Sequence, residues 1–345
     1  MSQMPIGDIV KVRYPTNRFG IRTRHHSFSV QLSGMSEPVM GLALGSGGSR
    51  GFAHIGVIEV LEEEGLRPDV IAGCSIGAMV GAAYLTGRLK DLRDWAEALT
   101  WHEVAGLLDI SLTGGGLFVG ELIERHLDVL GIIGNIEDLD RPFATVATNY
   151  LTGLEQCHRE GPIGKAVRAS MSIPGVLTPA KLGDDWFVDG GLVNPIPVSI
   201  CWALGAKFVI AINLNDGLVG SRELPGEVSK MSGGRGEMVE HAVAVLPASW
   251  REGTERAVHE FLKPRPPKPG YFEVLADSIN IMQDHITRSS LAREPPHVMI
   301  VPQLGSMGPF DFDQAKMAIE EGRKCTRNAL PEIRRNFSAN ASIPV

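Results

Sequence analysis

Between residues 39 and 74, two apolar segments flank a glycine-rich turn and a helical pattern. VMGLALG (39–45) is typical of a buried strand. Residues 52–64 predict a helix ending at Gly65, and DVIAG (69–73) predicts the next strand, after Pro68. A strand, a helix and a strand in this order indicate a parallel crossover, which is the unit of an α/β fold.

The same alternation continues along the chain. Helices are expected at 76–86, 91–104, 120–130, 163–170, 274–292 and 312–330, and strands at 143–150, 154–158, 186–189, 207–213 and 297–304. The fold class predicted is α/β, with helices covering a mostly parallel central sheet.

Composition shifts divide the chain into five segments. These are a basic arm (1–38), a core (39–215), a glycine- and proline-rich insertion with amphipathic helices (216–270), a C-terminal part of the core (271–335) and a tail (336–345). The insertion is a candidate lid or membrane contact. The arm up to residue 34 carries net charge +4, and because the chain totals -7, the rest carries -11. A basic arm of this kind can dock on an anionic bilayer, although a solvated tail is the alternative.

Charge and cysteine usage limit the functions open to the chain. A net charge of -7 argues against nucleic acid as a partner. The four cysteines form no CxxC pair, so we expect neither a zinc site nor a disulfide framework, and a reducing cytoplasmic setting follows. The first twenty residues lack the apolar core of a secretory signal. Residues 70–87 carry no charge and just reach the length of a membrane span, but they fit a buried strand and a packed helix better.

Two pentapeptides fit the GxSxG pattern of a nucleophile elbow, in which glycines permit the sharp turn that exposes a serine between a strand and a helix. The first candidate is Ser75 in GCSIG, between Gly73 and Gly77. The second is Ser49, in GGSRG. Ser75 has an apolar strand directly before it and a small-residue helix directly after it, so we expect Ser75 to be the nucleophile.

Ser49 belongs to a glycine-rich loop with a different expected use. The loop contains Gly45, Gly47, Gly48, Ser49, Arg50 and Gly51. Its glycines allow successive backbone N–H groups to converge on an anion, as in an oxyanion hole. A phosphate cradle is the alternative, but neither a P-loop GK[ST] nor a GxGxxG spacing is present. Arg50 either adds positive charge to the loop or braces it.

A serine nucleophile needs a base, and the residues alone leave two choices. Histidine is the usual base, and the candidates after Asp189 are His241, His259, His285 and His297. None of them has a supporting local motif. Asp189 itself follows the apolar segment WFV and precedes Gly190 and Gly191, which places a carboxylate at a strand end. His54 is expected to pack or cap rather than act as a base, and Cys74 to be a small buried residue.

Four ordered blocks resemble the patatin-like phospholipases, especially the bacterial ones. They are GLALGSGGSRGFAHIGVIEVLEEEG, GCSIG, ASMSIPGV and DGGLVNPIPV. The resemblance covers about residues 40–215, returns more weakly at 271–330, and leaves out the arm and the insertion. It implies a three-layer α/β/α fold and a Ser-Asp dyad, with Ser75 as nucleophile and Asp189 as base. The only departure in the elbow is Cys74, where the family often has threonine.

The resemblance also implies an activity. It indicates a carboxylic ester hydrolase that cleaves acyl esters of phospholipids or lysophospholipids, with no metal or cofactor, working in the cytoplasm or peripherally at the inner face of the membrane. Two alternatives stay open: a soluble esterase or acyltransferase with a Ser-His-Asp triad, and a regulatory protein on the same fold. Headgroup, acyl chain and oligomeric state are not predicted.

Overall fold

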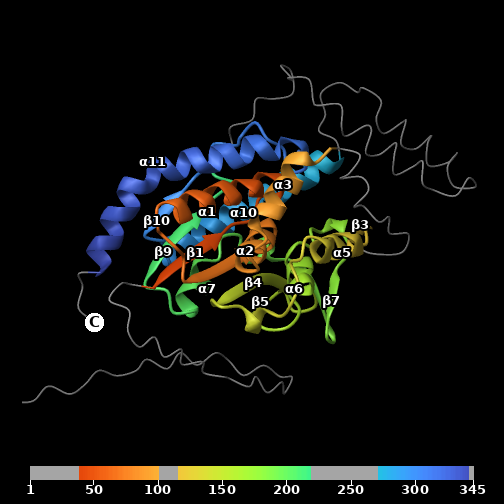
Figure 1. Cartoon of the computed structure of the whole chain (residues 1–345). Coiled ribbons are helices and arrows are strands. Elements are labelled where there is room, and N and C mark those ends of the chain that lie inside the picture. The colour runs from red at the N-terminus through yellow and green to blue at the C-terminus, as the bar shows by residue number, and fades with distance from the viewer. Residues whose placement is uncertain (1–38, 101–115, 219–270, 342–345) are drawn as a thin grey trace, which may run out of the picture. The chain divides into compact units, whose positions relative to one another are not determined.

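An eight-stranded sheet forms the centre of the molecule, in the order β10-β9-β1-β2-β4-β8-β7, with β5 also paired to β4 (Figure 1). The computed structural model describes residues 39–100, 116–218 and 271–341. The strands of this sheet are β1 (Met40–Leu44), β2 (Val70–Cys74), β4 (Phe143–Asn149), β5 (Glu155–His158), β7 (Ala180–Leu182), β8 (Asp185–Asp189), β9 (Phe208–Ile212) and β10 (Val298–Ile300). Two short strands, β3 (Gly116–Phe118) and β6 (Gly175–Leu177), pair separately.

Five of the strands run parallel. β10, β9, β1, β2 and β4 are joined by parallel ladders, whereas β5, β8 and β7 add antiparallel pairs around β4. The predicted α/β class with a mostly parallel sheet is therefore confirmed. The three-residue strands β3, β6 and β7 were not predicted, whereas β10, which is equally short, lies in the longer segment 297–304 that was predicted as a strand.

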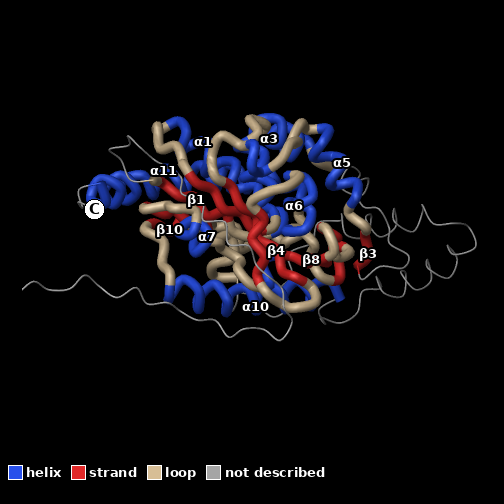
Figure 2. Tube along the Cα trace, turned by 90° about the horizontal axis from the view of Figure 1, so that it is seen from below, coloured by secondary structure: helices blue, strands red, loops and turns tan. Residues whose placement is uncertain are grey.

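Helices cover both faces of the sheet. They are α1 (Ala53–Glu63), α2 (Ile76–Leu85), α3 (Leu89–Ala98), α5 (Glu121–Val129), α6 (Ile163–Ser170), α7 (Val198–Ala203), α10 (Tyr271–Arg293) and α11 (Ala315–Ala341), with short 3-10 turns at Gly48–Phe52, Ile136–Asp138, Gly190–Leu192 and Phe312–Gln314. Figure 2 shows α10 on the side of the strands away from α1 and α3. The arrangement is three layers, α/β/α.

Alternating side chains give the two faces of the sheet different cores. Leu42, Leu44 and Ile71 join residues of α1, α2, α3, α6 and α11 in the larger cluster. Ala43 and Ala72 point the other way, toward α7 and Leu291 of α10. Successive side chains of a strand point to opposite faces of the sheet. In β1 and β2 the large residues therefore lie on one face and the small residues on the other. The small face lets the backbone of α7 approach the sheet closely.

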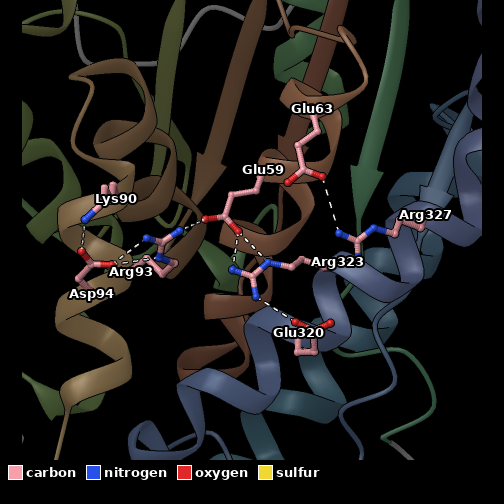
Figure 3. Close-up of polar contacts among 8 residues, drawn as sticks. All are labelled: Glu59, Glu63, Lys90, Arg93, Asp94, Glu320, Arg323 and Arg327. Atoms are coloured by element: carbon pink, nitrogen blue, oxygen red, sulfur yellow. Dashed lines mark hydrogen bonds and ion pairs between the residues drawn. The ribbon is translucent and has the colours of Figure 1, made fainter.

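A network of ion pairs attaches α11 to the helices beside it (Figure 3). Glu59 of α1 accepts hydrogen bonds from Arg93 of α3 at 2.8 Å and from Arg323 of α11 at 2.9 Å. Arg323 also pairs with Glu320, and Arg327 lies 3.7 Å from Glu63. Glu59 and its two arginines are only about one fifth exposed, so this carboxylate bridges three helices with less solvent screening than a surface pair has.

Residues 70–87 form β2 and α2, as expected, and none of the helices in the described ranges is long and apolar enough to span a bilayer. Two expected helix ends differ from those in the structure. The helix expected to end at 330 continues through Pro331 to Ala341, so residues 336–341 are helical rather than a tail. The helix expected at 91–104 ends at Ala98. The basic arm and most of the expected insertion, from 219 to 270, lie outside the described residues.

Candidate active site

Ser75 occupies the sharp turn between β2 and α2. Its φ is 55° and its ψ is -123°, and among the described residues no other non-glycine has positive φ. Such a conformation costs on the order of 1–3 kcal/mol for a side chain with a Cβ, and persists only where the surroundings impose it. Strain of this kind is what the nucleophile-elbow geometry requires.

The two glycines of the elbow allow α2 to pack against β1 and β2 without space for a side chain. A Cβ on Gly77 would lie 2.2 Å from the carbonyl oxygen of Leu44, and one on Gly73 would lie 2.5 Å from the carbonyl oxygen of Gly77. Both separations are far below a van der Waals contact, so any larger residue would displace the first turn of α2. The GxSxG pattern thus has a local steric reason at this position.

Strand β4 aligns the ends of β2 and β8, and so brings Ser75 to Asp189. Cys74, the last residue of β2, pairs with Val146, and Asp189, the last residue of β8, pairs with Ala147. Both strands lie on the same side of β4, because β5 occupies the opposite side along the same residues. β2 and β8 therefore meet end to end, and the residues that end them become neighbours although 114 positions separate them.

The side chains of Ser75 and Asp189 are directly hydrogen-bonded. The Ser75 hydroxyl donates to Oδ2 of Asp189 at 2.7 Å, and both residues are 4% exposed. The Gly191 amide donates to the other carboxylate oxygen, Oδ1, at 2.7 Å. Burial raises the pKa of Asp189 from 3.8 to about 6, although both hydrogen bonds oppose the rise. The carboxylate is thus a stronger base than an exposed aspartate.

The glycine-rich loop of residues 45–51 lies beside this pair. Gly47, Gly48, Ser75 and Asp189 line one cleft. The amides of Ser46 and Ser49 donate to the carbonyls of Pro195 and Pro309, but no described residue accepts a hydrogen bond from the amide of Gly47 or Gly48. Gly48 has φ +59, and a Cβ there would lie 2.3 Å from the Pro309 carbonyl oxygen. The loop therefore has two backbone N–H groups in the cleft without a described acceptor, and an oxyanion hole is made of such donors.

Ser49, the second GxSxG serine, has its hydroxyl hydrogen-bonded to a backbone carbonyl and not to Asp189. Its hydroxyl donates to the carbonyl oxygen of Gly308 at 2.8 Å and its side chain is fully buried. Arg50 donates to the Met307 carbonyl oxygen at 3.2 Å and to Oδ1 of Asn215 at 3.0 Å. Arg50 therefore ties the loop to the segments around it. Gly51 allows α2 to pack close, since a Cβ there would lie 2.0 Å from Ile76, and Gly45 likewise approaches the Ile212 carbonyl oxygen.

The Asp-Gly-Gly turn fits tightly against its neighbours. A Cβ on Gly190 would lie 2.2 Å from the Val146 carbonyl oxygen, and one on Gly191 would lie 2.2 Å from Nε2 of Gln283. The Asp189 carbonyl oxygen accepts a hydrogen bond from the Thr148 hydroxyl at 2.8 Å. These contacts fix the backbone that carries the carboxylate.

The described histidines contact neither Ser75 nor Asp189. His54 has Nε2 2.8 Å from the Gly45 carbonyl oxygen, and burial lowers its pKa to about 4. The neutral ring donates there and holds the start of the glycine loop, in agreement with its expected packing role. His297 accepts from the Val209 amide through Nδ1, and His285 is exposed on α10. His241 and His259 lie outside the described residues. Cys74 is fully buried, as expected.

Sequence reasoning missed the residues that hold the site in place. The turn at the end of α6 contacts both members of the pair: the Ser170 hydroxyl accepts from the Ser75 amide at 2.8 Å, and the Ser172 carbonyl accepts from the Asp189 amide at 2.9 Å. Ser170 also donates to the Val146 carbonyl. These serines stand in the block ASMSIPGV, but only a fold that places α6 beside β2 and β8 reveals their partners.

Helix α10 forms another wall of the cleft. Ala276, Ile279, Asn280 and Gln283 of α10 line it, together with Ile173, Pro174 and Leu192. Gln283 accepts from the Ser46 hydroxyl at 3.0 Å and from the Asn215 amide group at 2.9 Å. The cleft encloses about 490 Å³ including its open mouth. Most of the surface that lines the cleft is apolar.

Comparisons with known proteins identify the family of the chain. The patatin-like phospholipase family matches residues 42–202. An uncharacterized NTE family protein of Mycobacterium bovis is 32% identical over 91% of this chain and 98% of its own length. Human patatin-like phospholipase domain-containing protein 6 is 34% identical over 55% of this chain, which corresponds to 14% of that protein.

Among solved structures, VipD from Legionella pneumophila aligns with 88% of this chain and 67% of its own, at 13% identity and a TM-score of 0.41. The near full-length similarity to the mycobacterial protein and the match over the segment that carries both Ser75 and Asp189 lead to one conclusion. The chain belongs to the patatin-like phospholipase family, and NTE family proteins are among its relatives.

Proposed function

We propose that this protein is a serine lipid acyl hydrolase that cleaves acyl esters of phospholipids or lysophospholipids, with Ser75 as nucleophile and Asp189 as base. The observation that carries the proposal is the 2.7 Å hydrogen bond from the Ser75 hydroxyl to a buried carboxylate, beside a loop whose Gly47 and Gly48 amides have no described acceptor. Membership of a family of phospholipases supports the substrate class.

The chemistry follows from these groups. As the Ser75 oxygen attacks the ester carbonyl carbon, its proton passes to Asp189, and the carbonyl oxygen becomes an oxyanion. The Gly47 and Gly48 amides, which belong to the lining of the same cleft, are the proposed donors to that oxyanion. The protonated Asp189 then returns its proton to the leaving alkoxide, which departs as an alcohol. A water molecule then gives a proton to Asp189 as its oxygen attacks the acyl carbon. When the bond between the acyl carbon and the Ser75 oxygen breaks, Asp189 passes that proton to the Ser75 oxygen and the fatty acid leaves.

Product analysis with a matched inactive variant tests this function. The purified full chain is incubated with a mixed lipid extract, and released fatty acids and lysolipids are identified by mass spectrometry. We expect fatty acid release by the wild type and none by Ser75→Ala. A fluorophosphonate probe is expected to label the wild type at Ser75 alone. Unlabelled wild-type protein that releases no fatty acid would favour a regulatory protein on the same fold.

Variants of the late histidines separate the dyad from a triad. His241→Ala, His259→Ala, His285→Ala and His297→Ala are each expected to retain ester hydrolysis, because the base proposed here is Asp189. The measurement is kcat on a short-chain soluble ester. Loss of activity in one folded histidine variant would support the triad instead.

Ser170 is expected to act as a positioning residue for the elbow. Ser170→Ala leaves the buried Ser75 amide and Val146 carbonyl without this hydrogen-bond partner. Each unsatisfied group costs about 1–3 kcal/mol of folding free energy unless the elbow shifts to find another partner. We expect kcat to fall by about ten- to a hundredfold with KM little changed. The matched control is Ser172→Ala, because Ser172 contacts Asp189 through its carbonyl oxygen, which alanine retains. Equal loss in both variants would contradict a specific role for Ser170.

A further inference from the structure

The antiparallel strands around β4 extend beyond the edge of the sheet at which the site lies. β1 and β2 end at this edge and lead into the glycine loop and Ser75. β4 runs parallel to β2 but continues to Asn149, two residues or roughly 7 Å past the level of Asp189. The turn 150–154 follows, and the β7–β8 turn lies beside it, since the Tyr150 amide donates to the Trp186 carbonyl at 2.8 Å.

Large apolar side chains are exposed on this extension, which we call the projecting tip (residues 150–154 and 183–186). Leu151 is 75% exposed, Leu154 62%, Tyr150 61% and Trp186 44%. Four such residues on two adjacent turns are unlike isolated surface apolar residues, which are common and need no explanation. Tyrosine and tryptophan are also the residues enriched where an apolar phase meets water.

The charges around the projecting tip indicate what kind of lipid surface it can contact. Lys181 has its Nζ 5.9 Å from the centre of the Trp186 ring. Asp184, Asp185 and Glu155 are exposed on the same turns and strand ends. Three carboxylates against one ammonium group would be repelled by an anionic surface, whereas a zwitterionic surface accepts both signs.

We infer that the projecting tip inserts into a zwitterionic lipid surface and docks the cleft edge of the sheet on it. The inference rests on the proposed function, because docking at this edge places the Ser75–Asp189 cleft on the side from which an ester would leave the bilayer. The tip reaches past Asp189 by roughly 10 Å at Trp186, three residues along β8. That reach matches the 5–10 Å depth at which interfacial elements lie in a bilayer.

Vesicle binding in an inactive background tests the docking separately from the chemistry. Full-length Ser75→Ala protein is sedimented with phosphatidylcholine vesicles, with and without Leu151→Asn and Leu154→Asn together. Because burying one leucine side chain changes a partition constant by about tenfold or more, we expect the pair to weaken binding by at least about tenfold. The matched control is Val129→Asn with Ile133→Asn, a pair of similar exposure in and after α5, where Val129 lies near Arg88 and Asp91.

With Ser75 intact, the tip variants are expected to hydrolyse a soluble short-chain ester at the wild-type rate and vesicle phospholipid at least about tenfold more slowly. If wild-type protein cleaves neither ester, the proposed function is rejected. The vesicle sedimentation experiment still tests the docking in that case. The docking inference is overturned by unchanged binding in the tip variant, by equal loss in the control pair, or by binding that requires anionic lipid and disappears at high salt. It is also overturned if Ile281→Asn with Met282→Asn on α10, rather than the tip variant, abolishes binding.

Discussion

Ester hydrolysis is expected to fall by about four or more orders of magnitude when either Ser75 is replaced by alanine or Asp189 by asparagine. In the proposed mechanism the two side chains act on one proton: Ser75 supplies it and Asp189 accepts it across their 2.7 Å hydrogen bond. Residues that act as a unit each carry nearly the whole effect, so the double variant is expected to lose little more than either single one. The measurement is kcat/KM on a soluble ester, for both variants and their combination.

Asp189→Asn is also expected to make the protein more stable at neutral pH. Burial raises the folded-state pKa of Asp189 to about 6, above the value near 4 expected for an unfolded chain. The folded state therefore holds its proton more tightly, and stability is lost as pH rises from about 4 to about 6. Two pKa units correspond to about 3 kcal/mol at pH 7. Asparagine keeps an oxygen for the Gly191 amide and carries no charge, so it removes this cost.

Thermal unfolding against pH measures the effect. The melting temperature of Asp189→Asn is expected to exceed that of the wild type by several degrees at pH 7–8, with the difference vanishing below about pH 4. Ser75→Ala is the control, because it abolishes activity but retains the buried carboxylate, and so gains no stability at high pH. In the wild type, kcat/KM is expected to rise about tenfold per pH unit below 6 and to level off above it. A profile with no inflection near 6 would remove Asp189 from the role of base.

The sequence predicted the parts of the site that depend on local geometry. The elbow around Ser75 needs glycine on both sides, and glycine, serine and an apolar strand stand in order in the sequence. The glycine loop was recognised for the same reason. The distance between Ser75 and Asp189 could not be predicted, because it depends on β2 and β8 meeting end to end along β4, a register that no local pattern encodes.

Residues that act through distant contacts were not found from the sequence. Gln283 contacts Ser46 across 237 positions, and Pro309 accepts from the Ser49 amide across a similar span. Ser170 gave no signal, since a serine at the end of a helix is ordinary. The antiparallel strands β5, β8 and β7 were predicted only in part. The three-residue strand β7 was not found, and the side of β4 on which β8 pairs depends on where β2 ends.

Gly48→Ala is expected to lower kcat by about a hundred- to a thousandfold while the protein stays folded. Gly48 has φ +59, which alanine adopts only with strain, and the new Cβ would lie 2.3 Å from the Pro309 carbonyl oxygen. That oxygen cannot move freely, since it accepts from the Ser49 amide at 3.0 Å. The loop must therefore shift, and with it the Gly47 and Gly48 amides. Losing one oxyanion donor typically costs about 2.7–4 kcal/mol of transition-state stabilisation.

Gly65→Ala separates this effect from general strain. Gly65 follows α1 with φ +71, but a Cβ there would meet nothing within 4 Å. Both substitutions place alanine in the left-handed region, so both are expected to lower the melting temperature, and Gly48→Ala more because of its clash. Only Gly48→Ala is expected to lower kcat, measured on a soluble ester so that lipid binding does not enter. If Gly65→Ala loses as much activity, or if Gly48→Ala retains it, the amides of this loop do not stabilise the oxyanion. Since Ser75 and Asp189 are untouched in either variant, fluorophosphonate labelling at Ser75 shows in addition whether the nucleophile is still in place.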